Sequence, residues 1–341
     1  MARHINIPIF IPHLGCPNQC VFCNQRLISG TYEFSESKVR ENIDSALSTV
    51  PEGCECEIAF FGGSFTGIDK ALMIRLLTIA KGYVDRGVVS SIRCSTRPDY
   101  IDESILSILG EYGVKTVELG LQSVSESVLK ITKRGHGIEA AKRAARLIVE
   151  GGFTLGGQMM IGLPGASPED EIKTARFIAE SGAGEARIYP TVVFFGTELC
   201  DMTRAGEYTP LSVEEAVGRS AAALRILLDA GVKVLRIGLC DSENLHADES
   251  YFAGPNHPAM GELVLSELYY EIMSDGLLEI ENLKDKSVII SVGTGHLSKA
   301  IGQKRGNYLR IMERFKPGSL KFKENPFLQP YKVGIEVNER I

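Results

Sequence analysis

Short apolar runs and amphipathic stretches follow one another in a repeated order along the first two thirds of the chain. Residues 35–50 show the amphipathic type, because Val39, Ile43, Ala46 and Leu47 recur at helical spacing after a Ser-x-Ser-Lys opening. The pattern predicts six strands, at residues 7–12, 56–61, 89–94, 116–121, 153–161 and 186–190. It predicts helices at residues 35–50, 70–83, 103–112, 138–150 and 168–180.

Strand and helix thus alternate six times, which predicts right-handed crossovers and a parallel sheet. The expected fold is α/β, a partial (β/α)6 barrel of TIM type with a small C-terminal α+β appendage. A predicted helix at 213–230 and a predicted strand at 234–239 follow the six repeats. We divide the chain into the barrel (1–240), a connecting loop and helix over the barrel mouth (241–285) and the appendage (286–341). Functional groups of such barrels lie at the carboxyl ends of the strands.

Composition narrows the class of protein. The 341 residues are 44% hydrophobic, which is enough for a sizeable core. We find no basic and apolar leader and no apolar run of the roughly 18 residues that a membrane span needs. We therefore expect no membrane association and a cytoplasmic location. Eight cysteines, three of them clustered, fit a reducing compartment and metal ligation better than disulfides.

The cluster is formed by Cys16, Cys20 and Cys23, directly after the first predicted strand. Four ligands would close a zinc site or an electron-transfer cluster, but no fourth Cys or His follows at ligand spacing. Three thiolates on a four-iron, four-sulfur cluster would leave one iron open to a small chelating molecule. The alternatives are an incomplete zinc loop or three unrelated cysteines.

Polar and glycine residues mark the ends of several predicted strands. Gly62, Gly63 and Ser64 follow the second strand, where glycines let a backbone approach a charged head group. Arg97 follows the third strand and can pair with a ligand carboxylate. Gln122 follows the fourth strand and can bond a ribose hydroxyl. A ligand-free turn at the glycines and a surface salt bridge at Arg97 are the alternatives.

Charge is unevenly distributed. The whole chain carries -6, yet residues 284–323 hold ten basic and two acidic side chains, a net of +8. This segment is predicted as strand 287–292, helix 295–301, a basic loop at 302–306, helix 307–315 and strands 320–322 and 332–337. The order resembles a KH-type module, so Gly302, Lys304 and Arg305 are candidate RNA contacts. The alternative is a basic helix pair without a nucleic-acid partner.

The cysteine spacing, with Phe22 just before the third cysteine, resembles the radical S-adenosylmethionine (SAM) superfamily. The resemblance implies that Cys16, Cys20 and Cys23 hold a [4Fe-4S] cluster and that Phe22 lies beside the adenine of SAM. It also implies that the Gly62-Gly63-Ser64 turn binds the methionine amino group. In that superfamily, electron transfer from the cluster cleaves SAM to a 5'-deoxyadenosyl radical.

Three further motifs resemble the catalytic subunit of Elongator, which modifies the wobble uridine of transfer RNA. They are STRPD at 95–99, VELGLQSV at 117–124 with KRGH at 133–136, and IYPT at 188–191 with GTEL at 196–199. Similarity to coproporphyrinogen III oxidases implies that Gln122, Arg134 and Gln158 contact SAM. In those oxidases an Asp usually stands at the position that matches Gln158. We find no counterpart of Elongator's acetyltransferase domain, so we expect a reaction other than carboxymethylation.

The leading hypothesis is therefore a radical SAM enzyme that acts on RNA, most simply transfer RNA, and takes electrons from a donor such as flavodoxin or ferredoxin. The first alternative is a radical SAM enzyme of small-molecule metabolism, similar to the coproporphyrinogen oxidases. The second is a non-catalytic RNA-binding protein that keeps a cluster for structure.

Overall fold

The computed structural model describes residues 4–17, 19–30, 33–51, 53–239 and 251–339. The chain forms two compact units, residues 1–216 with 226–256 and residues 217–225 with 257–341. Residues 240–250, where the sequence-based division ends the barrel, lie outside the described residues. Among the described helices none is long and apolar enough to cross a membrane.

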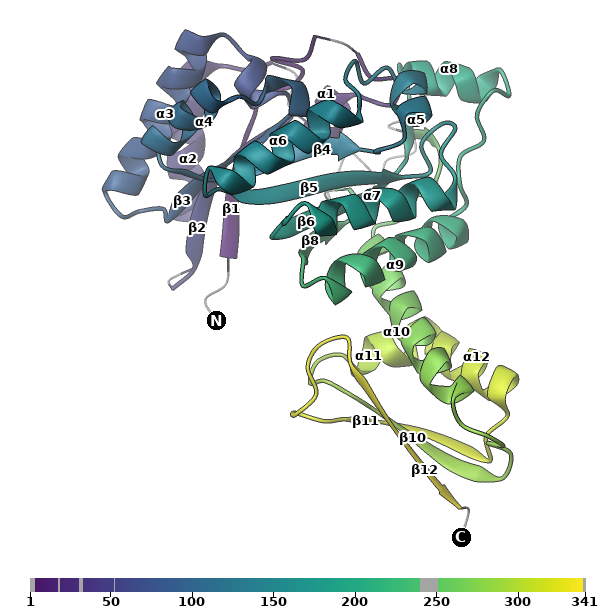
Figure 1. Cartoon of the computed structure of the whole chain (residues 1–341). Helices are drawn as coiled ribbons and strands as arrows, with labels where there is room; N and C mark the ends of the chain where they lie inside the picture. The colour runs from purple at the N-terminus through teal and green to yellow at the C-terminus, as the bar shows by residue number, and fades with distance from the viewer. Residues whose placement is uncertain (1–3, 18, 31–32, 52, 240–250, 340–341) are drawn as a thin grey trace. The chain divides into compact units, whose positions relative to one another are not determined.

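The first unit is built on one parallel sheet. Within the described residues the sheet has seven strands in the order β1-β2-β3-β4-β5-β6-β8, and every neighbouring pair is parallel. The sheet curls into a partial barrel (Figure 1). Six strands were predicted as repeats, and the strand predicted at 234–239 joins them as the seventh. The strands are β1 (His4–Phe10), β2 (Glu55–Phe61), β3 (Ser91–Thr96), β4 (Val114–Gln122), β5 (Thr154–Ile161), β6 (Glu185–Pro190) and β8 (Lys233–Ile237).

Helices on the convex side of this sheet connect the strands (Figure 1). Side-chain caps define several helix starts: Asp69 and Asp102 accept backbone N–H groups, and Ser167 forms a capping box with Asp170. These helices are α2 (Val39–Ser48), α3 (Lys70–Asp85), α4 (Glu103–Glu111), α6 (Ile138–Glu150) and α7 (Pro168–Glu180). Helix α9 (Val213–Asp229) precedes β8 in the chain, and its residues 217–225 belong to the second unit. Shorter elements are α1 (Gln25–Ser29), α5 (Glu126–Ile131), α8 (Glu198–Arg204) and the pair β7 (Val193–Phe194) and β9 (Tyr251–Ala253).

Charged residues fill part of the barrel interior. The buried guanidinium of Arg93 donates to Glu57 at 2.5 Å, to Glu118 at 2.8 Å and to Glu185 at 3.0 Å. Arg187 donates to both oxygens of Glu118, at 2.8 and 3.0 Å. Buried charges are tolerated only when they are paired and hydrogen-bonded. The interior therefore contains a connected ion network instead of the apolar layers usual in such barrels.

The second unit is an α+β module. Its three-stranded sheet, in the order β11-β10-β12, pairs β10 in parallel with β11 and antiparallel with β12, as far as the described residues extend. Strand, helix, basic loop, helix and two strands follow in the predicted order. The elements are α10 (Met260–Leu278), β10 (Lys286–Val292), α11 (Leu297–Ile301), a 3-10 turn (Gln303–Arg305), α12 (Gly306–Phe315), β11 (Ser319–Glu324) and β12 (Val333–Glu339).

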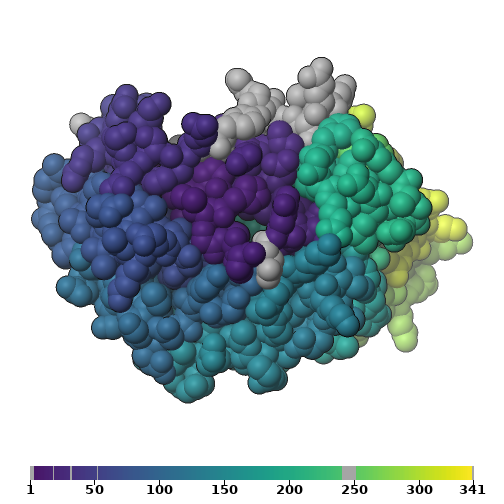
Figure 2. Space-filling view, turned by 90° about the horizontal axis from the view of Figure 1, so that it is seen from above, coloured from purple at the N-terminus to yellow at the C-terminus, as the bar shows by residue number. Residues whose placement is uncertain are grey.

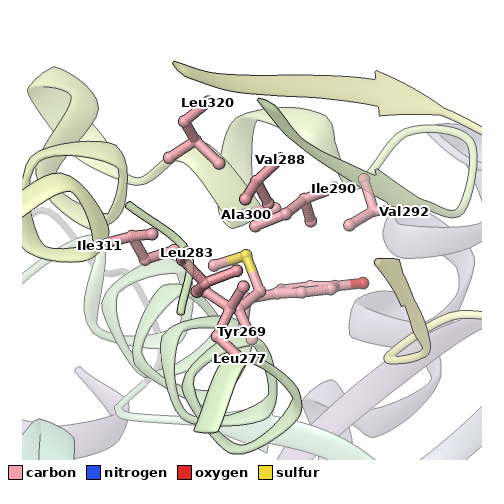
Figure 3. Close-up of a cluster of buried hydrophobic side chains, with 10 residues drawn as sticks. Tyr269, Leu277, Leu283, Val288, Ile290, Val292, Ala300, Ile311 and Leu320 are labelled. Atoms are coloured by element: carbon pink, nitrogen blue, oxygen red, sulfur yellow. The ribbon is translucent and has the colours of Figure 1, made fainter. Parts of the chain in front are cut away.

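One apolar core holds this module together. Figure 3 shows Val288, Ile290 and Val292 of β10 facing Tyr269 and Leu277 of α10. All five are buried. Val288, Ile290 and Val292 share one face of the sheet because alternate residues of a strand point to the same side. Helix α10 therefore belongs to the second unit, which begins at residue 257 for this part of the chain, whereas the sequence-based division placed 257–285 in a connecting segment.

Candidate functional site

The candidate site lies where the carboxyl ends of the barrel strands meet the cysteine loop. A cavity of about 200 Å3 opens there, lined by Phe22 and Cys23 of the loop and by Gly62, Gln122 and Gln158 at the strands. Figure 2 looks onto this side of the molecule and shows a hollow bordered by N-terminal residues, coloured purple. Sequence analysis predicted that Phe22 of the loop and Gly62, Gln122 and Gln158 at the strands would lie at one site.

The three cysteines lie on one loop, and Cys23 of this loop lines the cavity. Cys16 is exposed, Cys20 is buried and Cys23 is half-buried, and the Cys23 backbone N–H donates to the Cys20 carbonyl at 3.0 Å. Burial, together with the neighbouring Cys20 and Cys16, raises the pKa of the Cys23 thiol to about 12. The thiols are thus close enough to influence one another. Within the described residues, no three His, Cys, Asp or Glu side chains could hold a single metal ion. A cluster instead spreads its thiolate ligands over several irons.

The glycine turn after β2 packs directly on the cysteine loop. A Cβ at Gly63 would lie 2.4 Å from the Leu14 carbonyl oxygen, and one at Gly15 would lie 2.2 Å from the Ser64 carbonyl oxygen. Real Cβ atoms cannot approach so closely, so both glycines are needed for the two loops to meet. Gly62 and Gly63 line the cavity. The Ser64 hydroxyl is buried against Thr96, at 3.1 Å, and accepts the Arg97 backbone N–H.

Arg97 is buried at the end of β3, and its guanidinium contacts an internal carboxylate. It donates to both oxygens of Asp99, at 2.9 and 2.8 Å. Burial alone would raise the pKa of Asp99, but the hydrogen bonds and charge of Arg97 outweigh it and lower that pKa. Arg97 was predicted to contact a ligand, but its guanidinium is already hydrogen-bonded within the protein.

Two glutamines present amide groups to the cavity. Gln122 has a left-handed backbone, with φ of 65°, and its Oε1 is buried without a hydrogen-bond partner among the described residues. Gln158 donates through Nε2 to Ser95 Oγ at 3.1 Å and to Glu118 Oε2 at 2.8 Å. Because the Nε2 group of Gln158 donates to Ser95 and Glu118, its carbonyl Oε1 is the atom of this amide that can accept a hydrogen bond from a ligand.

Arg134 reaches the cysteine loop from the segment after α5. Its Nη1 donates to Cys20 Sγ at 3.2 Å, and its Nη2 donates to the Gly120 carbonyl. Its Nε is buried without a partner in the described part of the chain. Arg134 was predicted from the resemblance to contact the cosubstrate. The structure places it against a predicted cluster ligand.

These features fit the two groups that the cysteine pattern implies. The three thiols lie close enough to influence one another, and Gln122, which lines the cavity, has a buried orphaned Oε1 that a bound ligand would satisfy. Cys16, Cys20 and Cys23 would hold a [4Fe-4S] cluster. Phe22 and the Gly62-Gly63 turn would surround the cosubstrate.

Sequence reasoning missed the polar floor of the cavity. Ser95 and Arg187 line the cavity beside Gln158, and Glu118 connects Gln158 with Arg187 from below. A signal was present, since Glu57, Arg93 and Glu118 interrupt apolar runs at positions where strand alternation points inward. Charged residues at interior positions of predicted strands indicate a polar barrel core.

The predicted RNA loop lies in the second unit. Lys304 and Arg305 are exposed and have left-handed backbones, with φ of 50° and 63°, between Gly302 and Gly306. The Arg305 guanidinium lies 4.1 Å from the centre of the Tyr308 ring. Asn307 is buried and donates to the Ser266 and Ala300 carbonyls, which anchors the base of the loop.

Comparison with known families identifies the class of protein. The model of the radical SAM superfamily matches residues 10–178, and that of the radical SAM C-terminal domain matches residues 185–270. The chain therefore belongs to the radical SAM superfamily. Members of this class are enzymes that use a [4Fe-4S] cluster and SAM, in agreement with the cysteines and the cavity described above.

Individual relatives narrow the comparison. The chain is 37% identical to a tRNA uridine(34) acetyltransferase of Methanocaldococcus infernus over 125 residues, which are 36% of this chain and 23% of that protein. It is 30% identical to the tRNA uridine(34) acetyltransferase of Dehalococcoides mccartyi over 268 residues, with coverage of 68% and 58%. The structure of archaeal Elp3 from M. infernus superposes with a TM-score of 0.63 at 23% identity, and the match covers 81% of this chain and 64% of that one. The chain thus spans less than two thirds of each of these relatives.

Proposed function

We propose that this radical SAM enzyme modifies transfer RNA. When bound, the [4Fe-4S] cluster supplies the electron that cleaves SAM and so generates the family's 5'-deoxyadenosyl radical. Two of the relatives named above are called tRNA uridine(34) acetyltransferases. The radical SAM family model matches residues 10–178, which include most of the residues that line the cavity. The observation that carries the proposal is the size and lining of that cavity.

The cavity favours one planar, uncharged ring. Its volume of about 200 Å3 lies below the roughly 300–1,000 Å3 typical of whole small-molecule sites, so it suits one part of a larger substrate. Phe61 and Tyr189, which are not among the predicted SAM contacts, contribute aromatic surface on which a base can stack.

The small-metabolite alternative fits this lining less well. A porphyrin-type substrate carries several carboxylates, which require several cations for recognition. Among the cavity-lining residues that the structure describes, Arg187 is the one cation, and its Nε and Nη2 are bonded to Glu118. A neutral ring of RNA meets no such requirement.

A purely structural cluster would not need a cosubstrate cavity. The buried Gln122 Oε1 and Arg134 Nε lack partners within the described residues, and orphaned polar atoms of this kind cost roughly 1–3 kcal/mol each. A bound cosubstrate that forms hydrogen bonds with these atoms would remove that cost. This argument favours an enzyme over a non-catalytic RNA-binding protein with a cluster.

The basic loop of the second unit supports an RNA substrate independently. Lys304 and Arg305 are exposed between Gly302 and Gly306, which resembles the Gly-x-x-Gly loop of KH type with one additional residue between the glycines. A left-handed conformation costs about 1–2 kcal/mol per non-glycine residue, and such strain is concentrated at functional loops. We assign Gly302, Lys304 and Arg305 to phosphate contacts.

The proposal includes two further elements. The reaction requires a low-potential electron donor such as flavodoxin or ferredoxin. A transfer RNA substrate also implies a cytoplasmic enzyme.

The test presents the reconstituted enzyme, SAM and reductant with bulk transfer RNA and, separately, with a metabolite extract. Mass spectrometry of digested nucleosides should reveal a new nucleoside with the wild type and none with Cys20→Ala. A Cys20-dependent change in the metabolite pool with unchanged RNA would overturn the proposal in favour of the small-molecule alternative. Absence of SAM cleavage by iron-loaded enzyme would favour the non-catalytic reading.

A further inference from the structure

A buried arginine contacts a cysteine ligand of the cluster in this fold. The Nη1 of Arg134 donates to Cys20 Sγ at 3.2 Å, and both residues are buried, with exposed fractions of 6% and 7%. An arginine remains protonated at all relevant pH values, so the contact brings a permanent positive charge to this sulfur.

The guanidinium is held by the fold, not by the cysteine alone. Its Nη2 donates to the carbonyl of Gly120 in β4, and a Cβ at that glycine would lie 3.4 Å from Nη2. The backbone N–H of Arg134 donates to the Leu129 carbonyl at 2.9 Å. A rigid strand and the end of a helix therefore fix the position of the charge.

The cysteine loop is tied to the same segment. The Val21 N–H, next to Cys20 in the chain, donates to the Thr132 carbonyl at 3.3 Å, and Thr132 is fully buried. The segment that carries Arg134 is thus hydrogen-bonded to the cysteine loop at two neighbouring residues, Cys20 and Val21.

We propose that Arg134 raises the reduction potential of the cluster by donating a hydrogen bond to the Cys20 ligand sulfur. Hydrogen bonds to the sulfurs and net charge are among the factors that set such potentials. One electron from an external low-potential reductant adds one negative charge to the cluster, and a buried guanidinium beside it favours that reduced form. Arg134 keeps its proton throughout, and no bond is made or broken at it.

This role differs from that of the neighbouring arginine. Arg97 is also buried near Cys16, but its guanidinium is neutralised by two hydrogen bonds to Asp99. The Nη atoms of Arg134 bond to a thiol and a carbonyl. Arg134 is therefore a positioning and tuning residue for electron transfer into the cluster. The inference depends on the cluster of the superfamily and not on the RNA substrate.

The test compares Arg134→Gln, Arg134→Lys and the control Lys130→Gln. Gln removes the charge, Lys keeps it as a compact single donor, and the control removes an exposed charge four positions away. Each protein is reconstituted anaerobically without SAM, its iron is counted, and the cluster is titrated potentiometrically by electron paramagnetic resonance. For Arg134→Gln we expect a tenfold shift of the reduction equilibrium toward the oxidised cluster, about 59 mV for one electron.

Arg134→Lys should shift the potential less than Arg134→Gln, and Lys130→Gln should leave it unchanged. A wild-type potential in iron-loaded Arg134→Gln overturns the proposal. Loss of iron from both Arg134 variants also overturns it, because Arg134 would then serve assembly of the site. If only Arg134→Gln loses iron, a lowered potential in Arg134→Lys supports the proposal and an unchanged one overturns it.

Discussion

Arg187 and Glu118 form a two-pronged ion pair under the floor of the cavity, with Nε to Oε2 at 2.8 Å and Nη2 to Oε1 at 3.0 Å. Glu118 also accepts hydrogen bonds from Arg93 and Gln158. Burial alone would raise the pKa of Glu118, but the charges and hydrogen bonds of Arg187 and Arg93 lower it. One carboxylate thus connects the interior ion network with a residue that lines the cavity.

The first prediction concerns this carboxylate. Glu118→Ala leaves two buried guanidinium groups short of a partner, and breaking a buried pair in this way costs about 3–5 kcal/mol. We expect urea denaturation to show that loss in the free energy of unfolding. Glu139→Ala, which removes the exposed pair with Lys142, should cost roughly 1 kcal/mol or less. Equal stability of the two variants would contradict the interpretation.

The second prediction concerns pH. Burial, assisted by the charge of Arg134, lowers the pKa of His136 to about 4; Arg97 acts in the same direction and Asp99 opposes it. Between the unfolded value near 6.5 and the folded value, the unfolded chain binds more protons. Stability is therefore fully present above about pH 6.5 and falls as the pH decreases toward 4.

His136→Gln in cluster-free protein should flatten the dependence of unfolding free energy on pH in this window. The measurement is chemical denaturation at several pH values between about 4 and 7. A slope identical to that of the wild type would exclude His136 as its source.

The third prediction concerns iron. Anaerobic reconstitution should load about four irons per chain, as a [4Fe-4S] cluster requires, and Cys20→Ala should lose most of them. Cys94→Ala is the matched control, because Cys94 is a buried cysteine of β3 outside the loop. Full iron content in Cys20→Ala would mean a different ligand set.

The fourth prediction concerns the basic loop. If Lys304 and Arg305 contact phosphates, replacing both with Ala should reduce the slope of log K against log salt for transfer RNA by about two units. Ala keeps the left-handed backbone strain, so the comparison isolates charge. Lys321→Ala with Lys332→Ala removes the same charge from other exposed positions of the second unit and should leave the slope closer to the wild type. If the two double variants have equal effects, the loop contributes only positive charge to RNA binding and no specific phosphate contacts.

Much of the fold could be predicted because it follows from local patterns. The apolar runs and helical spacings predicted the alternation of strand and helix, and the fold class and family are confirmed. The strand observed at 233–237 was predicted, at residues 234–239, but its membership of the sheet was not, because pairing depends on a partner far away in the chain. Likewise, a helix was predicted within the connecting segment at 241–285, whereas α10 packs in the second unit.

The sequence by itself determined the chemistry on offer: three thiols at 16, 20 and 23, glycines at strand ends, and a basic loop at 302–306. These signals lie within a few residues, where spacing and backbone conformation dictate what can converge. Only the tertiary structure decided which groups meet. It placed Arg134, an expected cosubstrate contact, against Cys20, 114 residues away, and joined Arg93, Glu118 and Arg187 in one network. The curvature of the sheet brings interior side chains of different strands together. A local sequence pattern cannot predict such contacts, because they join residues far apart in the chain.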